Sequence, residues 1–123
     1  MKIKDLPKEN IVQKKSFSFA LDIVHFYKKL QSEHKEFVLS KQLLRSGTSI
    51  GALVREAEHA ESRKDFTHKM NIALKEANET RYWLDILFRS EYVSETNYAK
   101  LNDEITQLIK LLASIVKSSK LKV

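Results

Sequence analysis

The sequence predicts an all-α protein built as a four-helix bundle, and three observations support this fold class. Glycine and proline are scarce, with two glycines and one proline in 123 residues, and both residue types weaken helix interiors. Apolar residues recur at steps of three and four through most of the chain, which is the period of an amphipathic helix. Short polar segments divide the chain into four such stretches. We expect one domain over residues 1–123.

The first two helices are expected at about residues 10–33 and 36–59. The core-facing stripe of the first contains Val12, Phe19, Ile23, Phe26 and Leu30. The stripe of the second follows alternating steps of four and three through Leu39, Leu43, Ser46, Ile50, Leu53 and Ala57. This alternation is typical of helices that cross at about 20° in left-handed bundles.

The third and fourth helices are expected at about residues 62–89 and 94–118. Ser62 and Ser94 are favourable N-cap residues, and Ser62 together with Asp65 makes a weaker version of the capping box. The two core stripes are Phe66, Met70, Ala73, Ala77, Thr80, Leu84 and Leu87, then Leu101, Ile105, Leu108, Leu112 and Ile115. Four helices joined by short polar turns predict an antiparallel up-down-up-down, left-handed bundle.

Apolar residues left outside these stripes predict self-association. They lie on the far side of the first helix and beside the stripes of the second and third, whereas the outward positions of the fourth helix are polar. A helix that is apolar around most of its circumference needs cover on two sides. The alternatives are cover by the N-terminal arm and single exposure of each residue. The candidate oligomer interface is Phe17, Leu21, Val24, Leu44, Gly47, Gly51, Ile72, Trp83 and Ile86.

The two glycines, Gly47 and Gly51, lie four residues apart in the second helix. Each weakens a helix interior by about 0.8–1 kcal/mol relative to alanine, so we expect another backbone to approach them closely. That approach occurs within the bundle or between subunits. A continuous helix is favoured over a break with Gly47 as its C-terminal cap and a restart at Ser49.

The charge of +6 is compatible with nucleic-acid binding, because the first 35 residues hold eight lysines against four acidic residues. Lys14, Lys28 and Lys35 recur at multiples of seven and predict one basic edge of the first helix. Arg63 and Lys64 add charge at the turn between the second and third helices. The alternative for all five is plain solvation.

Several function classes are not supported by the sequence. Without cysteine there is no thiolate site or cysteine nucleophile. No apolar run approaches the roughly 20 residues of a membrane span, and no signal peptide is recognisable, so we expect a cytoplasmic protein that does not enter a membrane. No nucleophile elbow or phosphate-binding loop is present. We expect neither an enzyme nor a cofactor.

Two weak metal-like patterns have a simpler explanation. His59 lies three residues after Glu56, and His68 lies three residues after Asp65. Di-iron bundles use the similar Glu-x-x-His motif to bind their metal ions. Both histidines point away from the predicted core and lie near a turn, so we expect solvated side chains. Two further acids, Glu76 and Glu79, stand among apolar residues and are expected to accept Arg45 or Arg55 from a neighbouring helix or subunit.

Two segments resemble a bacterial family named for proteins encoded in intervening sequences of large-subunit ribosomal RNA genes. They are QLLRSGTSIGA at residues 42–52, continued by VREA at 54–57, and DF at 65–66 with IALKEANET and YWL at 72–80 and 82–84. Leu53 departs from the family pattern, which commonly has asparagine there, so a polar role of that residue does not carry over.

The resemblance implies an antiparallel four-helix bundle that assembles as a ring-shaped homopentamer, with no established catalytic activity or cofactor. A related protein, the accessory variability determinant of diversity-generating retroelements, binds a reverse transcriptase and nucleic acid through a basic surface. The family name records gene location and does not itself demonstrate RNA binding. We therefore expect a non-catalytic homo-oligomer that contacts RNA or a ribonucleoprotein partner, or alternatively a protein-interaction scaffold without nucleic acid.

Overall fold

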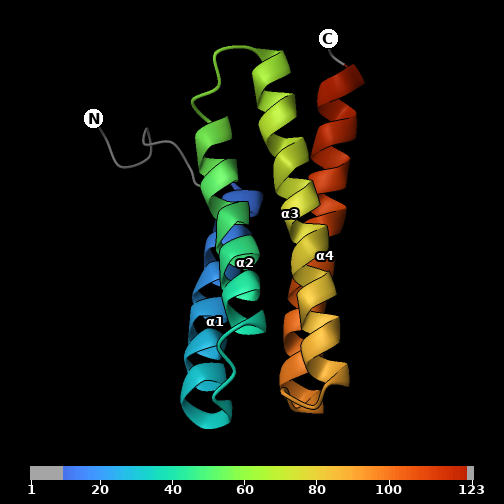
Figure 1. The fold of residues 1–123 in the computed structure, drawn as a ribbon. Helices are drawn as coiled ribbons and strands as arrows, with labels where there is room; N and C mark the ends of the chain where they lie inside the picture. The colour runs from blue at the N-terminus through green and yellow to red at the C-terminus, as the bar shows by residue number, and fades with distance from the viewer. Residues whose placement is uncertain (1–9, 122–123) are drawn as a thin grey trace, which may run out of the picture.

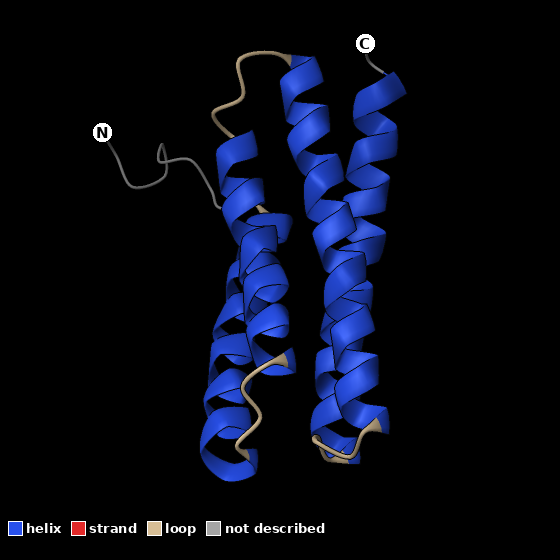
Figure 2. Cartoon of the chain, in the orientation of Figure 1, coloured by secondary structure: helices blue, strands red, loops and turns tan. Residues whose placement is uncertain are grey.

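Four helices make up the computed structural model, which describes residues 10–121. In chain order they are α1 (Ile11–His34), α2 (Leu39–Ala57), α3 (Arg63–Arg89) and α4 (Glu95–Leu121). Successive helices run in opposite directions and pack side by side, and α4 returns to contact α1 (Figure 1). Within the described range the connections are loops and turns, with no strand (Figure 2). The predicted all-α, up-down arrangement is confirmed.

Three helices begin at polar caps. The Asn10 side chain accepts the Gln13 backbone N–H at 2.9 Å, and the Gln13 side chain accepts the Asn10 N–H at 3.0 Å. These reciprocal bonds form a capping box. Ser62 and Ser94, as predicted, accept the N–H groups three residues further on at 3.0 and 3.1 Å.

The start of α2 differs from the prediction by three residues, because an acidic side chain caps it. The Glu36 carboxylate accepts the backbone N–H groups of Val38, Leu39 and Ser40 at 3.2, 2.9 and 2.6 Å. Burial alone would raise the pKa of Glu36, but these backbone donors outweigh it and lower the pKa below its ordinary value. Lys35, in the left-handed conformation with φ of 53°, ends α1 just before.

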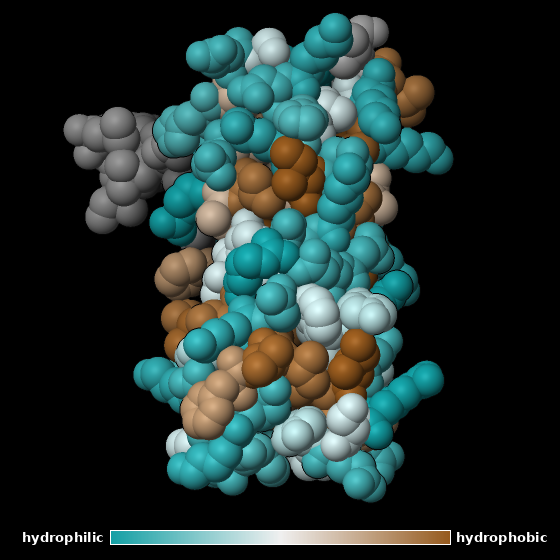
Figure 3. Space-filling model, viewed as in Figure 1, coloured by the Kyte–Doolittle hydropathy of each residue, from teal (hydrophilic) through white to brown (hydrophobic). Residues whose placement is uncertain are grey.

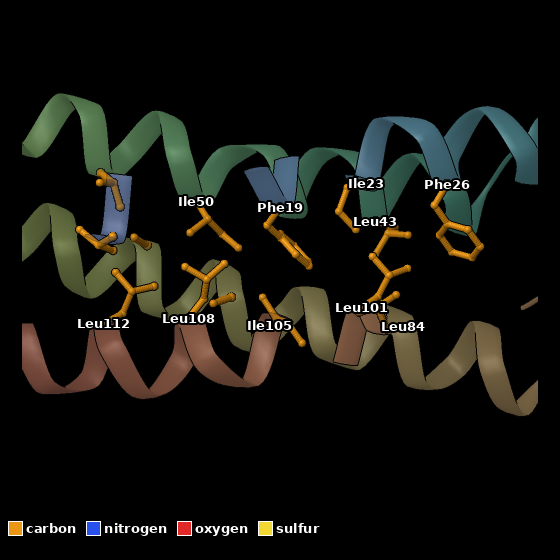
Figure 4. Packing of buried hydrophobic residues seen from close by; sticks show 14 of the residues in the cluster. Phe19, Ile23, Phe26, Leu43, Ile50, Leu84, Leu101, Ile105, Leu108 and Leu112 are labelled. Atoms are coloured by element: carbon orange, nitrogen blue, oxygen red, sulfur yellow. The ribbon is translucent and has the colours of Figure 1, made fainter. Parts of the chain in front are cut away.

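Buried side chains from all four helices point toward one another and fill a single core (Figure 4). The predicted stripes are buried along most of their length. Four residues of the predicted stripes are only partly buried: Leu39, Leu53, Phe66 and Ile115. The residue after each is buried instead: Ser40, Val54, Thr67 and Val116. An α-helix drifts by about 20° per heptad relative to a strict 3.5-residue repeat. Over two heptads the drift is about 40°, less than the roughly 100° between successive residues, so at Leu53 and Ile115 the next residue also turns toward the core.

The glycine pair lies where α2 packs against α1 of the same chain. A Cβ atom at Gly47, which is buried, would lie 3.0 Å from both γ carbons of Ile23. A Cβ atom at Gly51, which is half-buried, would lie 3.4 Å from the carbonyl oxygen of Ser16. The helix is continuous through both glycines, as predicted. The close approach at Gly47 is therefore an intramolecular one.

Alanine substitution should have opposite effects on the free energy of unfolding at the two glycines. In Gly47→Ala the new methyl group meets a stiff, fully buried isoleucine, and overpacking of about 1–3 kcal/mol exceeds the helix-propensity gain of about 0.8–1 kcal/mol. In Gly51→Ala the contact is an ordinary one, so the propensity gain stabilises the protein by up to about 1 kcal/mol. Urea denaturation at one protein concentration measures both. Equal shifts for the two variants would contradict the assigned close approach at Gly47.

Candidate nucleic-acid and assembly surfaces

The five predicted basic residues do not form one surface. Lys14, Lys28 and Lys35 are exposed, but the first and last are about 31 Å apart along the chain direction of α1 at 1.5 Å per residue. Arg63 and Lys64 begin α3, at the end of the bundle opposite Lys35 (Figure 1). The structure therefore divides the predicted basic edge between two ends of the molecule.

A groove between α1 and α4 brings Lys28 together with basic residues that the sequence did not single out. Its volume is about 430 Å³, and its lining consists of Asp22, His25, Phe26, Lys28, Lys29, Asn97, Lys100 and Leu101. Lysines stand on both walls, while the apolar side chains of Phe26 and Leu101 are buried beneath them. Since α1 and α4 are the first and last helices, no local sequence pattern reveals that their side chains meet.

Two carboxyl groups accompany these lysines. The Lys100 ammonium nitrogen lies 3.8 Å from a carboxylate oxygen of Asp22, across the groove. Glu104 follows one turn further along α4. Burial, a hydrogen bond from its carboxyl group to Asp22 and the Asp22 charge together raise the pKa of Glu104 to about 7, and Lys100 opposes them. A carboxyl group that gains or loses a proton near neutral pH therefore lies beside the groove.

Lys64 and Arg63 line smaller hollows at the other end of the bundle. Lys64 shares one with Thr67, His68, Asn71 and Lys120, and its volume is about 360 Å³. Arg63 lines a different hollow, together with Glu58. Lys64 of α3 and Lys120 of α4 thus form a second basic cluster, which again joins residues that are far apart in the sequence.

The predicted acceptors Glu76 and Glu79 both bind Arg45 across the α2–α3 seam. One guanidinium nitrogen lies 3.2 Å from Glu76, and the other bonds to Glu79. The hydrogen bond to Glu76 is the main cause that raises the pKa of Arg45. Glu79 also accepts the indole N–H of Trp83 at 3.1 Å, which fixes that half-buried ring. Arg55 instead stacks on an aromatic ring of α1.

The predicted interface residues differ in exposure. Phe17 and Leu21 on α1 are 50% and 49% exposed, and the Arg55 guanidinium lies 5.6 Å from the centre of the Phe17 ring. Gly47 is buried beneath α1, and the remaining candidates are half-buried: Val24, Leu44, Gly51, Ile72, Trp83 and Ile86. Thus α1 carries the most exposed part of the predicted interface.

Further apolar side chains gather over the beginning of α2 and the C-terminal half of α3 (Figure 3). Phe37, Val38 and Tyr82 are 49%, 72% and 58% exposed. The sequence prediction missed the first two because it began the second helix at residue 36 and did not recognise the Glu36 cap. Tyr82 packs edge-to-face on Trp83, with ring centres 5.2 Å apart.

His59 and His68 are exposed, as expected from their predicted orientation. Among residues 10–121, no group of three or more histidine, cysteine, aspartate or glutamate side chains is arranged to hold a metal ion. Within the same range, no helix has both the length and the apolar character that crossing a membrane requires.

Comparison with known proteins confirms the family resemblance. A family model described as 23S rRNA-intervening sequence protein matches residues 8–114. The chain is also similar to a crystal structure from Bacteroides thetaiotaomicron, described as a protein of unknown function from the S23 ribosomal protein family. The two are 59% identical with a TM-score of 0.86, over 87% of this chain and 99% of that one. No curated protein matches the chain significantly. Neither description names a catalytic activity.

The raised pKa of Glu104 predicts a pH-dependent stability difference. Its folded-state pKa of about 7 lies above the ordinary value of 4.5, so the folded protein holds the proton more tightly. The resulting stabilisation is fully present below about pH 4.5 and is lost as the pH rises through about 7. Glu104→Gln mimics the protonated group, so its melting temperature should exceed that of the wild type by a few degrees at about pH 8 and match it at about pH 5.

Thermal melts of Glu95→Gln, which removes an exposed carboxylate from the same helix, provide the control. This variant should differ from the wild type by the same amount at both pH values. A Glu104→Gln difference that does not change with pH would contradict the assignment.

Proposed function

The chain belongs to the 23S rRNA-intervening sequence protein family, and we propose that it is a non-catalytic, homo-oligomeric bundle that contacts RNA, alone or in a ribonucleoprotein partner. The observation that carries this proposal is the α1–α4 groove, where Lys28, Lys29 and Lys100 face one another across two helices. Lysines attract the phosphate backbone without reading its sequence. The overall charge of +6 favours the same partner.

Assembly is the second part of this proposal. Half-exposed side chains such as Phe17 and Leu21 each gain roughly 0.7–1.5 kcal/mol on full burial, about half the value for a fully exposed side chain. Phe17 and Leu21 lie on α1, whereas the apolar patch lies over the beginning of α2 and the C-terminal half of α3. Contact between two different patches is head-to-tail, and it closes as a ring where the rotation between copies allows closure. We propose a ring-like homo-oligomer of left-handed bundles, with five copies as the family resemblance implies.

A protein-interaction scaffold without nucleic acid is the alternative function. The observation that favours it is the exposed apolar patch containing Phe37, Val38 and Tyr82, because such patches mark protein-binding sites. The two functions differ in their response to salt. Apolar contacts persist at high ionic strength, whereas phosphate contacts weaken steeply.

The salt dependence of the RNA affinity should reflect the number of groove lysines that contact phosphates. With about three phosphate contacts and a slope of about −0.7 per contact, a fourfold increase in salt should weaken binding of a single-stranded RNA roughly 20-fold. Lys29→Gln should lower the slope by about one contact. Lys110→Gln removes an exposed lysine of α4 outside the groove and should leave the slope unchanged. Fluorescence anisotropy measures each; no detectable binding at low salt would reject RNA contact.

The oligomer should dissociate when charge is placed on the exposed face of α1. We expect the wild type to have about five times the 14.3 kDa mass of one chain, and Phe17→Asp to reduce that mass because an aspartate resists burial. Light scattering coupled to size-exclusion chromatography gives the mass, and circular dichroism verifies folding. Ala113→Asp, on the exposed side of α4, is the matched control. A monomeric wild type would contradict the assembly proposal.

A further inference from the structure

The α1–α4 groove combines lysines with the Lys100–Asp22 ion pair, and the carboxyl group of Glu104 lies beside it, bonded to Asp22; this combination points to proton-linked binding. We propose that the groove binds one phosphate group of an RNA backbone between Lys29 and Lys100, and that the phosphate displaces Asp22 from Lys100. This inference rests on the proposed RNA contact and adds the binding site and its regulation.

The contact between Lys100 and Asp22 is suited to such an exchange. Its N–O distance of 3.8 Å exceeds the 2.7–3.2 Å of a protein hydrogen bond. The Lys100 side chain is 65% exposed, whereas that of Asp22 is 27% exposed. Exposed ion pairs contribute little to stability. Lys100 can therefore turn to an entering anion without disturbing the fold.

The surroundings of Lys100 favour an anion of phosphate size. The groove volume of about 430 Å³ admits a phosphate group together with its sugar, and the Asn97 side chain on the same wall offers an amide donor. Lys28 and Lys29 approach from α1 and Lys100 from α4, so positive charge comes from both sides. Buried Phe26 and Leu101 exclude water from the base of the groove, which strengthens the charge interactions above them.

Glu104 links this exchange to protons. The charged groups around its carboxyl are Asp22 on α1 and Lys100 and Asp103 on α4; His25, Lys28 and Lys29 complete the charge of the groove. Ionised Glu104 repels a phosphate and competes for Lys100, whereas the protonated group does neither. When Lys100 turns to the phosphate, the cation that lowers the pKa of Glu104 is withdrawn, so binding takes up a proton. RNA affinity therefore rises as the pH falls through about 7.

The test is an RNA-binding titration at about pH 6 and about pH 8 in low salt. A fluorescent single-stranded RNA should bind the wild type roughly five- to tenfold more tightly at the lower pH. Glu104→Gln should bind at both pH values as tightly as the wild type does at the lower one. Lys100→Gln should bind weakly at both. Glu95→Gln should retain the wild-type pH dependence, whereas loss of that dependence in Glu104→Gln, which keeps His25, excludes this histidine as the source.

A second titration uses dimethyl phosphate, a diester that carries one negative charge at both pH values as an RNA phosphate does, and follows backbone amide shifts by NMR. The expected shifts are confined to residues 22–29 and 97–104 and are larger at the lower pH. RNA binding that is equal at both pH values, or a Glu104→Gln variant that keeps the wild-type pH dependence, overturns the inference while the proposed function stands. Phosphate binding without RNA binding overturns RNA as the source of the phosphate, together with the proposed function. Failure of both titrations overturns the site itself.

Discussion

The close packing of α1 against α2 at Gly47 is the constraint on which the rest of the structure depends. Ile23 fills the space that a side chain on Gly47 would need, so the two helices share a tight seam. α1 makes far less contact with α4 than with α2. The groove lies in this less closely packed seam. Its basic side chains therefore stand on the two neighbouring helices that contact each other least.

The two outer seams of the bundle differ in their chemistry. Arg45 joins α2 to α3 through Glu76 and Glu79, and this network also fixes Trp83. In the described part of the chain, polar contacts across the α1–α4 seam include a bond from Lys15 to Gln107 at 2.7 Å, the approach of Lys100 to Asp22, and the hydrogen bond from Glu104 to Asp22. Weak contacts such as those across the α1–α4 seam can be displaced by a ligand. The α2–α3 seam, where one arginine binds two carboxylates, is better suited to keep the two helices in a fixed position.

Sequence periodicity predicted the helices and most of the core, because burial on one side of a helix imposes a repeat that can be read locally. At Leu53 and Ile115 the residue after the predicted one is the more buried, since a straight helix drifts by about 20° per heptad from the repeat that the prediction assumed. It placed the start of α2 too early, because Glu36 caps that helix in place of a serine. Sequence periodicity could not predict the groove. It identified Lys28 as a candidate, but the proximity of Lys28 to Lys100 depends on the packing of the first helix against the last. The glycine pair correctly indicated a close approach, but the structure shows that the Ile23 side chain of α1, and not a backbone, comes close to Gly47.

The proposed RNA-binding site is the groove between α1 and α4. It can be tested by photochemical cross-linking of a single-stranded RNA containing 4-thiouridine, followed by mass spectrometry of the protein peptides. We expect cross-links in peptides that contain residues 22–29 and 97–104. Cross-links confined to the other basic cluster, around Lys64 and Lys120, or spread evenly over the surface, would contradict it.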